Sequence, residues 1–294
     1  ARMPTGGTLL LLTIATAAVA AAAAAAMPLP FTRVLTSGAR GADVRTAQYM
    51  LRRSAGGGRV ALDGVYGAGT AAAVTAMQRA HGLHADGVLG ANSAGALLRY
   101  YQSDSYSDAL RWPLPSPYAY KVHITTWRDR TRESPNATLY DAAGTPLLSF
   151  VARLHGKNLP DDPSRQRNMF TSDGVTPTGL MRFDLNSPEP YPRSYGPYPV
   201  NRAVDGVDGN AAFILTGNRT TMLRTGILLH TGEWPNWTPG DAMPNSDGCI
   251  HAYPDAIKTV WQKLVALGVD VRKNPFGTLP YPYAPQGLLS VEEL

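Results

Sequence analysis

The chain has 294 residues, of which 44% are hydrophobic and 17% charged, and its formal net charge is +5. This composition excludes a disordered protein and is sufficient for one sizeable domain with a smaller one beside it. The basic residues are scattered along the sequence, so we expect a solvated surface with at most a mild preference for anionic polymers, and no nucleic-acid binding.

The N-terminus is dominated by an apolar segment at residues 9–27, which follows Arg2 and continues as a long alanine run. A basic start, a short leucine-rich stretch and small residues are typical of a secretory signal peptide. As a helix this segment would extend about 28 Å, just enough to cross a bilayer, so a retained membrane anchor (residues 1–27) is the alternative. Both interpretations predict an extracytoplasmic protein, secreted or membrane-anchored, with its folded domains outside the cytosol.

Residues 31–99 are expected to form a small module of three short helices. The first helix follows Gly41, the second starts with Thr70 as its N-cap, and the third starts near Asn92 or Ser93. Glycines punctuate the segments between the helices, which is typical of tight turns.

The same module contains an internal repeat. The residues Asp-Gly-Val-Tyr-Gly at 63–67 recur as Asp-Gly-Val-Leu-Gly at 86–90, and each copy leads into a helix. The module therefore consists of two related half-units.

With its three helices, its glycines and its repeated Asp-Gly motif, the segment 31–99 resembles the peptidoglycan-binding domain of the three-helix type. Ser93 stands where that family commonly has threonine. The resemblance implies a non-catalytic module that holds cell-wall glycopeptide. A structural spacer that has lost ligand binding is the alternative, because most of the matching residues are core and turn positions. His81 and His84 lie three residues apart, but nothing nearby completes a metal site, so we expect no metal.

Beyond the module, a proline-rich segment at residues 100–119 predicts an extended interdomain linker. Residues 120–275 contain short strand-like runs separated by turns, and one helix is expected between Pro254 and Gly268. We therefore predict a multidomain α and β protein, with a three-helix module, a mainly-β domain carrying one packed C-terminal helix, and a tail at 276–294. The strand-like runs lie at 120–125, 147–152, 212–216 and 225–230.

The single cysteine, Cys249, is the residue most suggestive of chemistry, since no internal disulfide can form. Gly248 before it permits a tight turn that presents successive backbone N–H groups. His230 ends an apolar run and enters a loop, where a base can face a cleft. Because a thiol becomes a nucleophile when a neighbouring base or positive field activates it, we interpret Cys249 as a nucleophile and His230 as its base.

This arrangement resembles the L,D-transpeptidase (YkuD-like) catalytic domain, whose signature is a histidine, a fixed gap and then Ser/Thr-His-Gly-Cys. Here His230 precedes Ser-Asp-Gly-Cys at 246–249 by the matching gap, and residues 176–179 supply the family's Thr-Pro-Thr-Gly. Two residues depart from the pattern. Asp247 replaces the usual histidine and would raise the thiol pKa if it lay close, whereas a protonated His251, where Arg or Asn is common, would oppose that shift.

The resemblance implies that Cys249 attacks the carbonyl of the third residue of a peptidoglycan stem tetrapeptide and releases the terminal D-alanine. An amine acceptor would then give a 3→3 cross-link, and water would give L,D-carboxypeptidase activity. Backbone N–H groups near Gly248 would stabilise the oxyanion, and Ser246 would orient His230 or the loop, or serve only as a turn residue. The implied partner is peptidoglycan or a similar glycopeptide, and no cofactor is expected.

Other candidate residues lie around this motif. Trp234 and Trp237, between base and nucleophile, would contact substrate or pack internally. His123 and His155 are expected to be surface or strand residues rather than catalytic ones. The sequence also contains three N-glycosylation sequons, at Asn136, Asn218 and Asn236.

Two other functions stay open. The first is a membrane-anchored binding or structural scaffold with weakened chemistry, which is suggested by Asp247 and the apolar N-terminus. The second is a hydrolase that attacks foreign peptidoglycan. A buried Cys249, or a His230 distant from its sulfur, would favour the scaffold.

Overall fold

The computed structural model describes residues 26–53, 60–103, 106–109, 111–160, 162–207, 210, 224–234, 236–238 and 240–294. The expected signal peptide or anchor lies outside these residues except for its last two, and the strand expected at 212–216 lies outside them entirely. Within the described part of the chain, no helix is long and apolar enough to cross a membrane.

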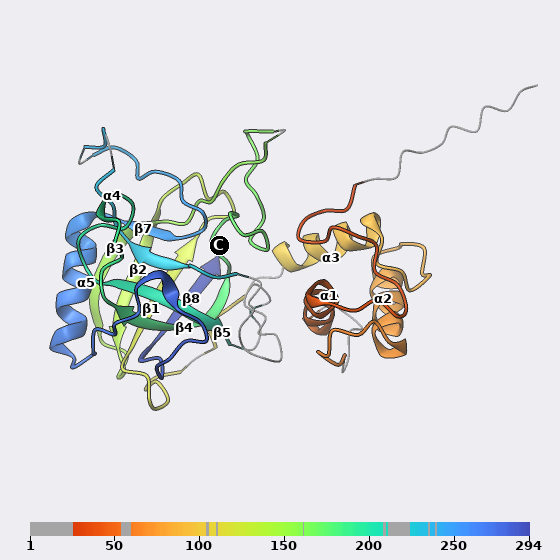
Figure 1. Cartoon of the computed structure of the whole chain (residues 1–294), viewed down its shortest axis with the longest axis horizontal. Coiled ribbons are helices and arrows are strands. Elements are labelled where there is room, and N and C mark those ends of the chain that lie inside the picture. Colours follow the sequence, from red (N-terminus) through yellow and green to blue (C-terminus); the bar gives the residue numbers. More distant parts are fainter. Residues whose placement is uncertain are drawn as a thin grey trace, which may run out of the picture.

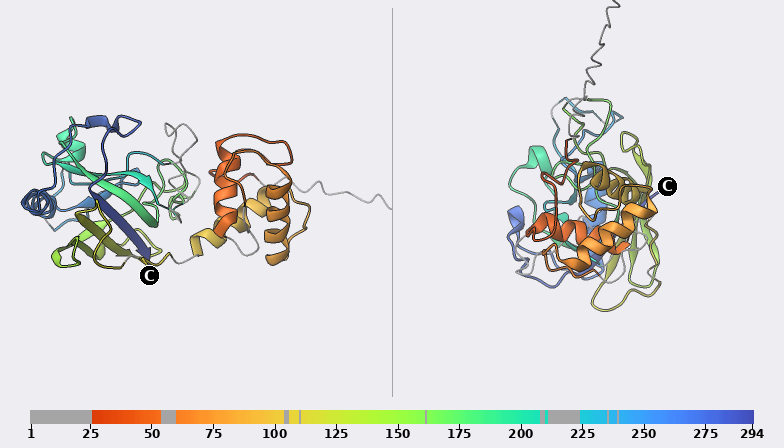
Figure 2. Two further views of the ribbon diagram at one scale, coloured as in Figure 1. Left: turned by 90° about the horizontal axis from the view of Figure 1, so that it is seen from below. Right: turned by 90° about the vertical axis from the view of Figure 1, so that its right-hand side faces the viewer.

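The described residues form two bodies side by side, a helical module and a β-barrel domain (Figures 1 and 2). The helical module contains α1 (Ala42–Arg53), α2 (Ala68–Ala80) and α3 (Ala91–Ser103). The barrel domain carries α5 (Pro254–Ala266), which buries an apolar stripe. The predicted combination of a three-helix module and a mainly-β domain with one packed helix is thus confirmed.

A buried glutamine organises the first half of the helical module. Gln48 on α1 places its Nε2 2.8 Å from Asp63 Oδ1, 3.0 Å from the Val65 carbonyl oxygen and 3.0 Å from Thr70 Oγ1. Its Oε1 accepts a 2.9 Å hydrogen bond from the Gly64 amide. One side chain therefore joins α1, the Asp-Gly turn and the first turn of α2.

Gln78 on α2 repeats this arrangement in the second half-unit. Its Nε2 lies 2.8 Å from Asp86 Oδ1, 3.0 Å from the Val88 carbonyl oxygen and 2.9 Å from Ser93 Oγ, and its Oε1 accepts from the Gly87 amide. The repeat seen in the sequence is therefore a repeated glutamine clamp, in which Ser93 takes the place that Thr70 has in the first copy.

The expected helix starts were wrong by a few residues for the same reason. Thr70 lies inside α2, whose N-cap is Gly67 with no side-chain cap. Ser93 likewise lies inside α3, which begins at Ala91. Both hydroxyls accept from a glutamine rather than capping a helix.

The barrel domain is a closed sheet in the order β1-β2-β3-β7-β6-β5-β4-β8. Most neighbours are antiparallel, but β1 pairs with β8 and β6 with β7 in parallel. A short helix, α4 (Pro192–Tyr195), and a 3₁₀ turn, η1 (Pro275–Gly277), lie in the connections. The strands are β1 (Tyr120–Thr126), β2 (Ser134–Asp141), β3 (Pro146–Arg153), β4 (Gly179–Asn186), β5 (Val200–Gly206), β6 (Leu228–His230), β7 (Ile250–Ala252) and β8 (Gly287–Glu293).

The expectation of a C-terminal tail at 276–294 was wrong, because β8 is an integral strand of the barrel. It pairs with β1 on one side and β4 on the other, so the barrel could not close without it. Leu288, Leu289 and Val291 are buried. Since adjacent leucines on opposite faces are both buried, the segment lacks the alternation that marks a half-exposed strand.

The segment expected as a linker at 100–119 also differs from a free spacer. Residues 100–103 continue α3. Further on, Leu114 is buried against the barrel and its amide donates to the Ala142 carbonyl oxygen, while the Trp112 ring lies 5.2 Å from that of Tyr140. The proline-rich stretch therefore packs on the barrel.

Replacing Gln78 by methionine should destabilise the helical module. The methionine fills a similar volume but leaves the buried Gly87 amide without its partner, so the free energy of unfolding should fall by about 2–3 kcal/mol. Gln48→Met should have a similar effect through Gly64. Urea unfolding followed by helical circular dichroism measures both.

Gln262→Met on the exposed face of α5 provides the matched control and should change stability by less than about 0.5 kcal/mol. If Gln78→Met were as neutral as this control, the glutamine clamp would not stabilise the module.

Candidate active site

His230 ends β6, and Cys249 immediately precedes β7, the parallel neighbour of β6. The register pairs Leu229 with Ile250 and His230 with His251. Leu229 and Ile250 belong to the main apolar core, whereas Cys249 packs in a separate small cluster. Because side chains alternate along a strand, His230 projects to the face opposite the core. Tyr195 packs on the His230 ring and on the cluster that contains Cys249, so Cys249 belongs to the same side of the sheet.

The His230 ring is held by a backbone carbonyl. Its Nδ1 lies 2.6 Å from the Thr231 carbonyl oxygen, and since a carbonyl can only accept, Nδ1 carries the proton of the neutral ring. Nε2 is then the nitrogen that can accept a proton. The ring is enclosed by Tyr195 and His251, with centroid separations of 5.1 Å and 4.7 Å. Burial, reinforced by His251, lowers the pKa of His230 to about 3.

Cys249 is nearly enclosed, with 9% of its surface exposed. Its thiol donates a 3.1 Å hydrogen bond to the Gly226 carbonyl oxygen. Burial raises the pKa of Cys249 to about 11, against the opposing effects of the Leu228 backbone and of the positive charges of Arg224 and Arg202. In this state the thiol and the imidazole are both neutral.

Ser246 organises the loop that carries the cysteine. Its Oγ lies 3.0 Å from the His155 carbonyl oxygen and 2.8 Å from that of Cys249, and it accepts a 2.9 Å hydrogen bond from the Gly248 amide. These contacts are with the loop and with the backbone of His155, not with His230. The Gly248 amide, expected near an oxyanion, is thus occupied by Ser246.

The Thr-Pro-Thr-Gly motif at 176–179 reaches the same loop. Thr176 is fully buried, and its Oγ1 donates a 2.9 Å hydrogen bond to the Gly248 carbonyl oxygen. The two motifs that carried the resemblance in the sequence are therefore in direct contact.

Arg224 is a residue of the site that sequence analysis missed. It is 1% exposed, and its guanidinium lies directly under Gly248, so that a Cβ at that position would collide with it. Nη1 donates to the carbonyl oxygens of Met169 (2.6 Å) and Val175 (3.1 Å). Nη2 donates to those of Gly174 and Asp247, each at 3.3 Å. The only feature of the sequence that could have indicated a role for Arg224 was its position just before the strand-like run 225–230.

The two departures from the family pattern lie on different sides of the loop. The Asp247 side chain is 64% exposed and pairs with Lys157 Nζ at 3.0 Å; its charge raises the thiol pKa, but less than burial does. His251 is buried, its Nδ1 donates to the Pro244 carbonyl oxygen, and burial lowers its pKa to about 4. His251 is therefore neutral at pH 7 and does not oppose Asp247.

Trp234 and Trp237 form an aromatic wall beside the histidines. The Trp234 ring lies 5.0 Å from His251 and 5.4 Å from Trp237, which in turn lies 5.8 Å from Tyr253. The wall thus continues through His251 to His230. Substrate contact by these tryptophans stays a prediction.

The remaining candidates lie away from this face. His123, on β1, is 3.3 Å from Ser290 Oγ, and the buried His155 ring contacts Asn158. Asn136 and Asn236 are exposed, and Asn218 lies outside the described residues. His84 pairs with Asp86, and no group of three or more His, Cys, Asp or Glu suited to a metal occurs within the described ranges.

Residues 40–97 match the family model described as "Putative peptidoglycan binding domain". This match confirms the resemblance predicted for the helical module. No curated protein matches the chain.

Two solved structures match most of the chain at low similarity. An L,D-transpeptidase (Yku) from Stackebrandtia nassauensis has 16% identity and a TM-score of 0.27, over 83% of this chain and 97% of that one. A fused Zn-dependent amidase/peptidase/peptidoglycan-binding domain-containing protein from Clostridium acetobutylicum has 14% identity and a TM-score of 0.23, over 88% and 99%.

The two buried histidines should make the protein acid-sensitive. Their pKa values in the folded protein, about 3 for His230 and about 4 for His251, lie below the ordinary 6.5. The unfolded chain therefore takes up protons first as the pH falls below about 6.5. The free energy of unfolding should decrease by up to about 1.4 kcal/mol per pH unit for each histidine, and urea unfolding between about pH 7 and pH 4.5 measures it.

His251→Gln should make this decline shallower, because one of the two buried neutral histidines is removed. A decline of equal steepness in His251→Gln and the unmodified protein would show that His251 is not held neutral.

Proposed function

We propose that the barrel domain is a cysteine-dependent acyltransferase acting on peptidoglycan stem peptides, an L,D-transpeptidase with L,D-carboxypeptidase activity when water is the acceptor. The observation that supports the proposal is that Tyr195 packs both on the His230 ring and on the small cluster that contains Cys249, with His230 Nδ1 fixed by Thr231. The peptidoglycan-binding match of the adjoining module supports the substrate class and a cell-wall, extracytoplasmic location.

In the proposed first half-reaction, His230 Nε2 takes the thiol proton as Cys249 Sγ attacks the carbonyl carbon of the third stem residue. A C–S bond forms, and the backbone amide of Cys249 donates to the oxyanion. Collapse breaks the C–N bond, and His230 returns the proton to the departing D-alanine amine. The product is a thioester on Cys249.

In the second half-reaction, an amine from a neighbouring stem attacks the thioester carbon. Its proton passes to His230 and then to the sulfur as the C–S bond breaks, which restores the thiol and leaves a 3→3 cross-link. Water in place of the amine yields a free carboxylate. We propose that the rings of Trp234 and Trp237 contact the substrate. A hydrolase that attacks foreign peptidoglycan would use the same first half-reaction and would differ only in taking water, rather than an amine, as the acceptor.

A wall-binding scaffold with weakened chemistry is the second candidate. It is favoured by the buried thiol, which donates to the Gly226 carbonyl oxygen and whose pKa is raised to about 11. The enzyme proposal requires substrate to displace this hydrogen bond, whereas the scaffold proposal requires only that the fold persist.

Intact mass of the purified protein separates the two candidates. After incubation with a disaccharide-tetrapeptide, or with a carbapenem as a second acylating probe, the unmodified protein should gain a covalent adduct and Cys249→Ala should not. His230→Gln should acylate about 10²–10⁴-fold more slowly, because general-base catalysis is lost. His84→Gln, at an exposed histidine, should acylate at the unmodified rate.

Released products then distinguish transfer from hydrolysis. Absence of an adduct with either probe, in protein whose circular dichroism shows it to be folded, would reject the enzyme and leave the scaffold.

A further inference from the structure

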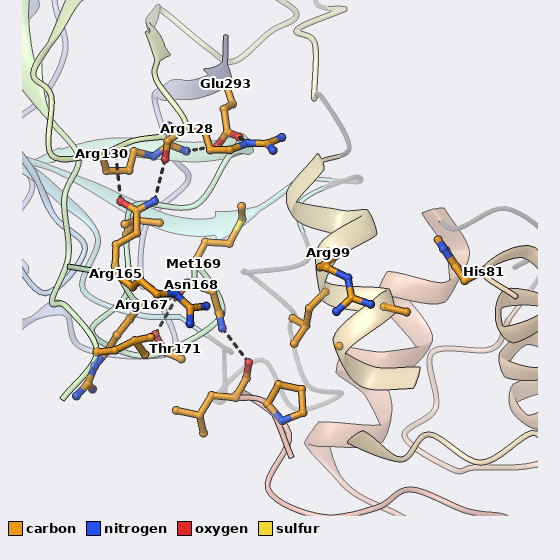
Figure 3. A pocket seen from close by; sticks show the side chains of 18 of the residues that line it. His81, Arg99, Arg128, Arg130, Arg165, Arg167, Asn168, Met169, Thr171 and Glu293 are labelled. Carbon is orange, nitrogen blue, oxygen red and sulfur yellow. Dashed lines mark hydrogen bonds and ion pairs between the residues drawn. The ribbon is translucent and has the colours of Figure 1, made fainter. Parts of the chain in front are cut away.

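A cavity of about 900 Å³ lies between the helical module and the barrel domain. One wall comes from α3 and the segment before α1, including Leu29 and Arg99. The opposite wall comes from the loops around Arg128 and Arg167 (Figure 3). Asn168 Nδ2 donates a 2.9 Å hydrogen bond to the Leu29 carbonyl oxygen and so joins the two walls. The volume is in the range of cavities that take small-molecule ligands.

The lining is strongly cationic. Among the described residues of the lining, Glu293 is the one carboxylate, and it is shared by Arg128 at 3.0 Å and Arg130 at 2.9 Å. Arg167 pairs with Asp173 at 2.5 Å, outside the lining, and Arg165 interacts electrostatically with Asp162. Arg99 and Arg165 have no ion pair within the described part of the chain. The lining arginines are Arg99, Arg128, Arg130, Arg165 and Arg167.

Arg130 adds a buried and incompletely paired cation. It is 1% exposed, and its Nε has no hydrogen-bond partner among the described residues. Burial lowers its pKa to about 10, which leaves it protonated at pH 7. Its Nη1 donates to the Trp127 carbonyl oxygen, and its Nη2 pairs with Glu293, a carboxylate that it shares with Arg128. A buried cation that shares its one carboxylate favours binding of a further anion.

The lining also has apolar surface between the cations, from Leu29, Leu83, Leu98, Met169 and Val175. A phosphate-rich polymer has few apolar groups to bury against these side chains, so they would add little to its binding affinity. A peptide that carries both methyl groups and carboxylates would contact both kinds of surface. The chemistry of the lining therefore favours an acidic, alanine-containing peptide.

Residues that line the cavity also contact Arg224, which supports the loop that carries Cys249. Met169 and Val175 line the cavity, and their carbonyl oxygens accept hydrogen bonds from Arg224. Arg224 also contacts the Asp247 carbonyl oxygen and lies under Gly248. A ligand in the cavity would thus lie against the back of the segment that supports Cys249.

We propose that this arginine-lined cavity binds the carboxylates of a peptidoglycan stem peptide, as a site separate from the one where Cys249 reacts. The choice of ligand rests on the proposed function, since it assumes that both domains engage the same glycopeptide. Arg99 and Arg165 hold the carboxylates, and the apolar side chains contact the alanine methyl groups.

Binding of a disaccharide-tetrapeptide to the full chain carrying Cys249→Ala, measured by titration calorimetry, tests the proposal without turnover. Arg99→Gln with Arg165→Gln should weaken binding at least about tenfold, because charge-assisted hydrogen bonds are lost. The same fragment with its carboxylates amidated should bind comparably weakly to both proteins. Arg111→Gln, an exposed arginine of the linker, should leave the affinity unchanged.

Three results would overturn the proposal. These are unchanged affinity in the double arginine variant, equally tight binding of the amidated fragment, or arginine-dependent binding of a polyglycerol phosphate in place of the tetrapeptide. A separate experiment distinguishes failure of this proposal from failure of the proposed function. It measures carbapenem acylation of a protein that carries Arg99→Gln and Arg165→Gln but retains Cys249. This acylation reports on the thiol alone and should equal the acylation of the unmodified protein.

Discussion

The candidate site depends on one buried guanidinium. Arg224 donates to carbonyl oxygens from two separate loops, those of Met169, Gly174 and Val175 on one side and that of Asp247 on the other. Burial of a charge is costly unless dipoles compensate it, and these carbonyls supply that compensation. The loop that carries Cys249 therefore has its conformation tied to a cation that only a glycine at position 248 can accommodate.

The electrostatics of the site follow from the same enclosure. Arg224 and Arg202 favour the thiolate, but burial of Cys249 outweighs them, and burial also keeps His230 and His251 neutral. A neutral thiol and a neutral imidazole suit the mechanism we propose, in which the proton moves as the C–S bond forms, rather than one that starts from a preformed ion pair. Exclusion of water around this pair would strengthen each hydrogen bond made in the transition state.

Much of the architecture was predictable because local sequence and tertiary contact agree. In the helical module, the recurrence of Asp-Gly at 63 and 86 indicated a repeat, and Gln48 and Gln78 explain it physically. The end of β6 at His230 was also predictable, since the apolar run 225–230 ends at that residue.

Other features depend on contacts distant in sequence and left no local pattern. Strand β8 is buried on both faces, because Leu289 and Val291 lie in the barrel core and Leu288 packs against Leu114 of the proline-rich segment, so its residues do not alternate. Arg224 resembles any surface arginine until the carbonyls of residues 169–175 surround it. Tyr195, which packs on His230, comes from a four-residue helix too short to show a period.

The most direct test of this account is the rate of carbapenem acylation at Cys249 in Gly248→Ala, compared with Gly268→Ala. Both glycines have positive φ, +101° and +83°, so both substitutions carry a backbone cost of about 1–2 kcal/mol. Only at 248 does the new Cβ meet Arg224, since nothing lies within 4 Å of the Cβ position at 268. We expect acylation about 10²-fold slower in Gly248→Ala and unchanged in Gly268→Ala, because small displacements of a reacting group are costly. Equal rates in the two variants, at equal stability, would contradict the claim that Arg224 and Gly248 together hold the nucleophile in place.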